Sequence, residues 1–239
     1  MKQKTILITG TSSGIGKASA LHFLKLGHIV HGIDKDPSTL CGWEGYYHYE
    51  VNICEKGQLP IITGINHLVF NAGVLQLEED PLGVNLVGTL NCEDVYVKPN
   101  LGTLESIVIL GSTAAEDGQD CREYVMSKGG LKSYTLYLAN ALGPHGVRVN
   151  CLTPGAGLTE MNRGHFDEET LHAVAQQNLL KRWGESYEYA EAIYFLCEKA
   201  TFTTGANLLA DGGEMIYSRY VWGLHEERPY PVEEVADEA

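Results

Sequence analysis

The segment YVMSK holds two side chains that could move a proton together, Tyr124 and Lys128. Residues four positions apart on a helix lie on the same face. A tyrosine with its ordinary pKa of about 10 is a poor base at neutral pH, but a neighbouring ammonium group stabilises the phenolate and lowers that pKa. The pair is therefore suited to general acid–base catalysis, although the same spacing also arises by chance in helices.

A third group lies twelve residues before Tyr124, where Ser112 follows an apolar run. Ligands in open α/β sheets bind beyond the carboxyl ends of the strands, which is where this hydroxyl is predicted to lie. Ser112 is the first choice for a residue that contacts substrate, and Thr113 is the reserve.

The segment ITGTSSGIGK at residues 8–17 places Gly10, Gly14 and Gly16 between an apolar run and a helical pattern. A glycine-rich turn in this position commonly lets a phosphate approach a helix N-terminus, and the alternative is an ordinary tight turn. Asp34 follows Gly14 by twenty residues, where a carboxylate accepts hydrogen bonds from ribose hydroxyls and repels a 2′-phosphate. This favours NAD over NADP, while Lys35 next to it could pair with such a phosphate.

Seven short apolar or β-branched segments alternate with helical patterns and predict the elements that position these groups. The first predicted strand is residues 5–8, and the helix that follows it is residues 17–27. The remaining predicted strands are residues 28–34, 46–53, 65–73, 104–113, 146–155 and 206–213. The expected fold is α/β: a Rossmann-like, doubly wound, parallel seven-stranded sheet with helices on both faces. No repeat or linker divides residues 1–239, so a single domain is expected.

Composition excludes several classes of partner. A net charge of −14 argues against nucleic acid and anionic membranes, which both require a basic surface. No apolar stretch reaches the length of a membrane span or of a signal peptide, so a cytoplasmic protein is expected. The six cysteines form no C-x-x-C pair, which favours buried free thiols over disulfides or a metal site.

Five motifs in order give the sequence a resemblance to the short-chain dehydrogenase/reductase family across nearly its whole length. They are TGTSSGIG at the first turn, NAG at 71–73, YVMSK, PG at 154–155 and ADGG at 210–213. The resemblance implies that Tyr124 is the general acid/base and that Lys128 holds the nicotinamide ribose and lowers the tyrosine pKa. It also implies that Ser112 binds the substrate oxygen and that Asn85 anchors a water in the proton relay.

The same resemblance implies a set of residues that bind the cofactor. The pyrophosphate turn comprises Gly10, Ser12, Ser13, Gly14, Ile15 and Gly16. Asp34 is expected to bind the ribose, and Asn52 and Ile53 the adenine. The adenosine side is expected to contact Asn71, Ala72 and Gly73. The nicotinamide end is expected to contact Pro154, Gly155 and Thr159, and Tyr124 and Lys128 are also expected to contact the cofactor. Asn71 and Thr9 could equally serve to tie strands together.

Three departures from the family pattern bear on the site. Asn52 stands where the family usually has Asp, although its amide oxygen still accepts a hydrogen bond. The interval from Asn52 to Asn71 and the approach to Asn85 are short, which predicts a truncated crossover. Gly111 occupies a position where the family often has a second serine.

The implied function is an NAD-dependent oxidoreductase that interconverts a secondary alcohol and a ketone. Residues 156–183 resemble the family's variable substrate lid, where Met161, Phe166, Leu171 and Trp183 suggest a partly apolar ligand or else a helix core. Similarity to bacterial hydroxysteroid dehydrogenase and carbonyl reductase members makes a steroid or cyclic ketone the first substrate choice. Sugars and polyols follow, then an acyl-carrier-protein reductase, which the negative charge disfavours. A dinucleotide-binding sensor or scaffold without turnover is the alternative from another class.

Assembly and the C-terminal extension are the last expectations. Residues 214–239 carry Tyr217, Tyr220, Trp222 and Tyr230 before an acidic end, and are expected to pack on the domain or on a neighbouring subunit. In the family, the helix that carries the catalytic tyrosine forms part of a four-helix interface. A homotetramer is expected, with a dimer as second choice.

Overall fold

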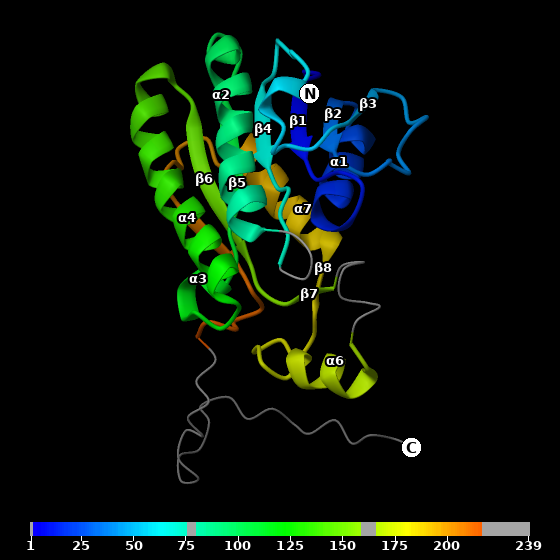
Figure 1. Ribbon diagram of the computed structural model, residues 1–239, viewed down its shortest axis with the longest axis vertical. Coiled ribbons are helices and arrows are strands. Elements are labelled where there is room, and N and C mark those ends of the chain that lie inside the picture. Colours follow the sequence, from blue (N-terminus) through cyan, green and yellow to red (C-terminus); the bar gives the residue numbers. More distant parts are fainter. Residues whose placement is uncertain (1, 76–79, 159–165, 217–239) are drawn as a thin grey trace.

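The computed structural model describes residues 2–75, 80–158 and 166–216. Its main sheet has seven parallel strands in the order β3-β2-β1-β4-β5-β6-β9 (Figure 1). The strands are β1 Thr5–Thr9, β2 Ile29–Asp34, β3 Tyr46–Glu50, β4 His67–Phe70, β5 Ser106–Leu110, β6 Arg148–Pro154 and β9 Asn207–Ala210. All seven predicted strands are confirmed, and the order reverses after β1, as in a doubly wound sheet.

The central strands are mostly apolar because helices cover both of their faces. Every residue of β4 and of β5 is buried. One face packs against α2 Thr89–Asn100 and α4 Arg122–Leu142, with Tyr96 and Leu131 in the core. The other face packs against α1 Gly14–Lys25 and α7 Ser186–Tyr194, with Phe23 and Ile193 in the core.

Shorter elements connect the strands and helices of this sheet. They are η1 Lys56–Gln58, the π-helix η2 Leu82–Gly88, α3 Ala114–Asp117, η3 Gly143–His145, α6 Glu168–Ala175, η4 Phe195–Lys199, and the two-stranded sheet of β7 Gly157–Leu158 with β8 Gly184–Glu185. Between β3 and β4 the only helical segment is η1, so the predicted truncated crossover is confirmed. Figure 1 shows α6 beyond the carboxyl ends of the strands. The predicted Tyr217, Tyr220, Trp222 and Tyr230 contacts lie outside the described residues.

The cysteine and membrane expectations can be compared with the described residues. All six cysteines are free; Cys92, Cys151 and Cys197 are buried, Cys54 and Cys121 are half-buried, and Cys41 is exposed. The prediction that the cysteines are buried is therefore confirmed for three of the six. The other three lie in loops or at the start of a helix. Within residues 2–75, 80–158 and 166–216, no helix combines the length and apolarity needed to cross a membrane.

A buried polar chain at the opposite edge of the sheet predicts how stability depends on pH. In the fully buried His67 ring, Nδ1 lies 2.8 Å from Ser106 Oγ and Nε2 lies 2.8 Å from Glu198 Oε1, both within hydrogen-bonding distance. Burial lowers the pKa of His67 to about 4, although Glu198 acts in the opposite direction. The unfolded chain, with an ordinary histidine pKa of about 6.5, therefore binds the proton first.

We expect the free energy of unfolding to fall as the pH falls from about 6.5 to about 4, by up to ~1.4 kcal/mol per pH unit. Urea unfolding between pH 7.5 and pH 4.5 measures this. His67→Gln should flatten the slope, and His145→Gln, which changes an exposed histidine, should leave it unchanged. An unchanged slope in His67→Gln would show that another group controls it.

Candidate active site

The turn between β1 and α1 depends on glycine at three positions. Gly10 has φ of +76° and Gly14 has φ of +51°, a left-handed conformation that residues with a Cβ rarely adopt. Gly16 has no such φ, but a Cβ there would collide with the Gly10 carbonyl and the Asn71 amide. The turn from β1 into α1 thus has no side chain at these three positions.

Asp34, at the end of β2, closes one side of this turn. Its Oδ2 accepts a hydrogen bond of 2.8 Å from the Ser12 backbone N–H, and its Oδ1 accepts one of 3.0 Å from the Asp36 N–H. The Ser12 hydroxyl in turn donates to the Asp36 carbonyl at 2.7 Å. The predicted ribose carboxylate and the predicted phosphate turn are therefore held together before any ligand binds.

A tyrosine that the sequence interpretation did not single out supports this arrangement from β3. The Tyr46 hydroxyl lies 2.9 Å from Thr11 Oγ1, 3.1 Å from Ser38 Oγ and 3.1 Å from His48 Nδ1. His48 Nε2 lies 3.0 Å from the Asp36 carbonyl oxygen. The segment YYHYE was interpreted only as a strand; its polar aromatic residues were the available signal for a hydrogen-bonded network.

Asn71 ties strands together, which was one of the two interpretations left open. Its Nδ2 donates to the carbonyls of Thr9 at 2.9 Å and Gly10 at 3.1 Å. The Thr9 hydroxyl accepts from the backbone N–H of Asn71 and of Ala72, both at 3.0 Å. Because Asn71 also lines the central cavity, the tie does not exclude a contact with cofactor.

Asn85 is buried within the π-helix η2. Its Oδ1 accepts from the Val74 N–H at 2.7 Å, and its Nδ2 donates to the Val74 carbonyl and to Ser127 Oγ, both at 3.0 Å. The side chain thus joins the segment after β4 to α4, and it does not line the cavity. Its expected role as the anchor of a relay water remains a prediction.

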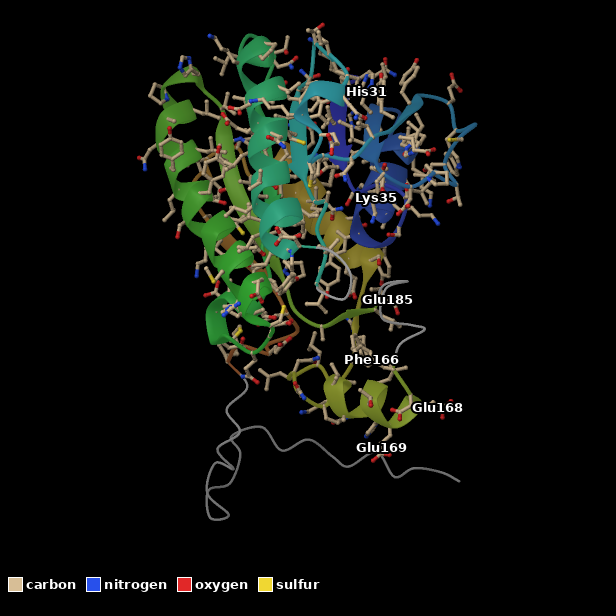
Figure 2. The ribbon with its side chains drawn as sticks, viewed as in Figure 1. His31, Lys35, Phe166, Glu168, Glu169 and Glu185 are labelled. Atoms are coloured by element: carbon tan, nitrogen blue, oxygen red, sulfur yellow. The ribbon has the colours of Figure 1, made fainter. Side chains whose placement is uncertain are left out.

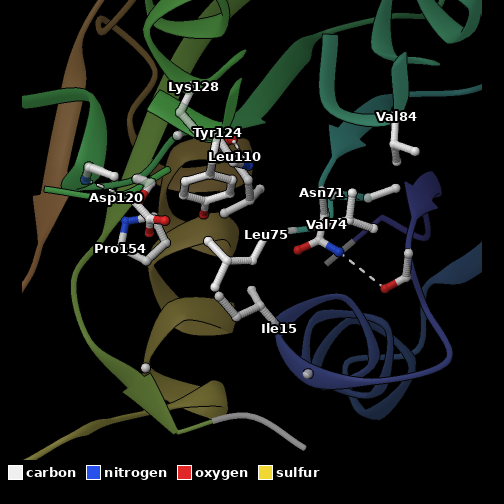
Figure 3. A pocket seen from close by; sticks show the side chains of 18 of the residues that line it. Ile15, Asn71, Val74, Leu75, Val84, Leu110, Asp120, Tyr124, Lys128 and Pro154 are labelled. Atoms are coloured by element: carbon white, nitrogen blue, oxygen red, sulfur yellow. Dashed lines mark hydrogen bonds between the residues drawn. The ribbon is translucent and has the colours of Figure 1, made fainter. Parts of the chain in front are cut away.

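Ser112, Tyr124 and Lys128 come together where β5 ends beside α4. Lys128 is buried; its Nζ donates to the Leu110 carbonyl at 2.9 Å and lies 5.7 Å from the centroid of the Tyr124 ring (Figure 3). Ser112 forms a hydrogen bond with the Tyr124 side chain, and its Oγ also accepts from the Ala114 N–H at 3.2 Å. The reserve candidate Thr113 faces Glu214 instead.

Burial dominates the acid–base properties of this group. It raises the pKa of Tyr124, against the effect of the Ser112 hydrogen bond, and it lowers the pKa of Lys128 to about 8. The expectation that Lys128 lowers the Tyr124 pKa is therefore wrong for this structure, because removing the phenolate from water outweighs its favourable contacts. Tyr124 is held in its protonated form at neutral pH.

One cavity of about 860 Å³ joins these parts. The predicted residues that line it are Gly10, Ser13, Gly14, Ile15, Asp34, Asn52, Ile53, Asn71, Ala72, Gly73, Ser112, Tyr124, Lys128, Pro154 and Gly155. Ser12, Gly16 and Asn85 do not line it, and Thr159 falls outside the described residues. In Figure 3, Asn71 and Val84 lie on one side of Tyr124 and Pro154 on the other.

Asn52 reaches the cavity at the end predicted for adenine. Its Oδ1 accepts from the Cys54 backbone N–H at 2.9 Å, so it also stabilises the turn after β3. An amide oxygen has two acceptor positions, which leaves one for a ligand. The substitution of Asn for the family's Asp is thus compatible with this wall of the cavity.

The apolar residues predicted for a substrate lid pack on each other. Trp183 Nε1 donates to the Leu171 carbonyl at 2.8 Å, and the centroids of the Phe166 and Trp183 rings lie 6.4 Å apart. None of these three lines the cavity, and Figure 2 shows Phe166 beside α6. Helix packing is the interpretation supported here, while Met161 lies outside the described residues.

In this Rossmann-like α/β protein, a glycine turn, a tyrosine, a lysine and a serine thus share one cavity at the carboxyl edge of the sheet, where open α/β sheets bind their ligands. Residues 78–214 match the family model described as enoyl-(acyl carrier protein) reductase. Glucose 1-dehydrogenase of Gluconobacter oxydans (strain 621H) is 30% identical, with 91% of this chain and 94% of that protein covered. The chain belongs to the short-chain dehydrogenase/reductase family and is an oxidoreductase of that family.

Two further comparisons agree with this membership. L-Rhamnose 1-dehydrogenase (NAD(P)(+)) of Sphingomonas sp. (strain SKA58) is 29% identical over 89% of this chain and 96% of that protein. The structure of 4-hydroxyisoleucine dehydrogenase complexed with NADH superimposes with a TM-score of 0.79 at 24% identity, covering 90% of this chain and 99% of the other. The latter similarity shows the fold.

Proposed function

We propose that this protein is an NAD-dependent oxidoreductase that interconverts a secondary alcohol and a ketone, with Tyr124 as the general acid/base. The observation that carries the proposal is the single cavity that joins the glycine turn and Asp34 to Ser112, Tyr124 and Lys128. A cavity of this kind accommodates a dinucleotide at one end and a small substrate at the other.

The residues of the turn fit a nicotinamide dinucleotide. Gly10 and Gly14 leave backbone open to a pyrophosphate, and Asp34 offers acceptors for ribose hydroxyls. The cofactor supplies hydride-accepting and hydride-donating chemistry when bound there. The role of Lys128 is to hold the nicotinamide ribose.

Tyr124 transfers the proton, and Ser112 positions the substrate for that transfer. In the oxidising direction the Tyr124 phenolate removes the proton of the substrate hydroxyl, and in the reducing direction the phenol returns it. The Ser112 hydroxyl holds the substrate oxygen against Tyr124. The hydrogen bond that already joins Ser112 to Tyr124 positions both groups for that contact.

Sugars and polyols are favoured over a steroid among the candidate substrates. The relatives named above include glucose and rhamnose dehydrogenases. The wall near Tyr124 also carries polar and charged side chains such as Asp117, Gln119 and Asp120. We propose a cytoplasmic homotetramer, whose interface would cover the exposed Met126, Leu136 and Tyr137 of α4.

Calorimetry with NADH and NADPH tests the cofactor assignment. We expect wild type to bind NADH at least about tenfold more tightly, because the Asp34 carboxylate repels a 2′-phosphate, and Asp34→Ala to lose that preference. Lys35→Ala should retain it. Tighter binding of NADPH to wild type, abolished in Lys35→Ala, would instead assign the adjacent lysine to a phosphate.

A further inference from the structure

Glu214 brings a carboxylate into the cavity that Tyr124 and Lys128 also line. It lies in the turn after β9, where its Oε2 accepts from the Ala156 backbone N–H at 3.1 Å. Its Oε1 lies 3.4 Å from the hydroxyl of Thr113, the neighbour of Ser112. A contact of that length leaves Oε1 largely available as an acceptor for a ligand.

Among the described residues, the groups that shift the pKa of Glu214 are neutral or negative. Burial and the carboxylates of Asp211 and Asp117 raise its pKa, while the Ala156 N–H and the Thr113 hydroxyl lower it. No cation is among the groups that shift it. Its charge is therefore not neutralised by an ion pair with another described residue.

The described wall around Tyr124 has the same character. Asp117 and Asp120 line it with Gln119 and Gln177, and Figure 3 shows Asp120 on the Pro154 side of the Tyr124 ring. Lys128 is the cation of this part of the described lining, and its ammonium is already bonded to the Leu110 carbonyl. A substrate that enters here meets acceptors and negative charge.

We propose that Glu214 is a specificity-determining residue that selects neutral, hydroxyl-rich substrates of the sugar or cyclic-polyol class and excludes substrates that carry phosphate or carboxylate. A carboxylate accepts strong hydrogen bonds from sugar hydroxyls. The same carboxylate repels an anionic group a few ångströms away, where water is partly excluded. This inference rests on the proposed oxidoreductase function and names the substrate class of that site.

Glu214→Gln tests the inference, because it keeps the shape and one acceptor oxygen but removes the charge. The kinetic probes are neutral aldohexoses (glucose, mannose and galactose), their 6-phosphates, and cyclohexanol as an apolar alcohol. We expect wild type to have a kcat/KM for a neutral sugar at least about tenfold above that for its 6-phosphate, and Glu214→Gln to reduce that ratio about tenfold. Glu191→Gln removes an exposed carboxylate of α7 outside the cavity lining and should leave the ratio unchanged.

Equilibrium binding gives a second readout that does not depend on turnover. Calorimetric titration of each sugar and its 6-phosphate into the NADH complex of Tyr124→Phe should show binding of the neutral sugar alone. Equal or tighter binding of the 6-phosphate, binding of neither, or a ratio unchanged in Glu214→Gln would overturn the inference. Faster oxidation of cyclohexanol than of any sugar would overturn it while leaving the proposed function intact, whereas NADH binding without turnover of any alcohol would count against the proposed function itself.

Discussion

Tyr124→Phe is expected to lower kcat for alcohol oxidation by about 10²- to 10⁴-fold, the usual contribution of a positioned general acid/base. The change removes only the hydroxyl, and it retains the ring that packs beside Lys128. NADH affinity measured by calorimetry should therefore remain close to that of wild type. Tyr187→Phe, which alters an exposed tyrosine of α7, is the matched control and should leave kcat unchanged.

The pH profile provides a second check on the same assignment. Oxidation requires the phenolate, and burial raises the pKa of Tyr124, so kcat/KM for oxidation should increase as the solution becomes more alkaline. Reduction requires the phenol and should decline over the same range. If Tyr124→Phe oxidised alcohols as fast as wild type, with an unchanged profile, Tyr124 would not be the proton-transfer group.

Gly16→Ala should weaken NADH binding by about 10- to 100-fold, the effect of forcing a methyl group into a packed site. The new Cβ would collide with the Gly10 carbonyl and the Asn71 amide, and so displace the turn from the conformation that leaves backbone open to phosphate. Urea unfolding should also show a lower free energy of unfolding than wild type.

Gly57→Ala is the matched control for this substitution. A Cβ on Gly57 has no atom within 4 Å, and the residue lies in η1 away from the cavity lining. Its NADH affinity should equal that of wild type. Unchanged affinity in Gly16→Ala would mean that the turn between β1 and α1 does not contact the dinucleotide.

The strands of this protein could be predicted because their signal is local. Parallel strands covered on both faces, such as His67–Phe70 and Ser106–Leu110, are short segments in which a single polar residue precedes a continuous apolar run. The glycine turn, Asp34 and the Tyr124–Lys128 pair could be identified for a similar reason, since spacing along the chain places each of them on an element. The π-helix Leu82–Gly88 has no comparable local signal, and it was not predicted.

The parts of the site that the sequence did not indicate depend on contacts between distant segments. Glu214 directly follows the recognised ADGG motif, yet its position beside Thr113 requires β9 to pair with β6 and β6 with β5. The Tyr46 network likewise joins β3 to the glycine turn. The pKa of Tyr124 was misjudged because the effect of burial cannot be obtained from the spacing of two residues.

Transfer of deuterium from NADH to a carbonyl substrate tests the central claim most directly. The enzyme would be incubated with NADH that carries deuterium at both C4 positions of the nicotinamide, together with the ketone or lactone of each candidate alcohol. The products would be analysed by mass spectrometry. The account predicts an alcohol product that carries one deuterium on its carbinol carbon with wild type, and at least about a hundredfold slower formation of that product with Tyr124→Phe. Tight NADH binding with no deuterated product from any substrate would contradict it and would favour a dinucleotide-binding sensor or scaffold.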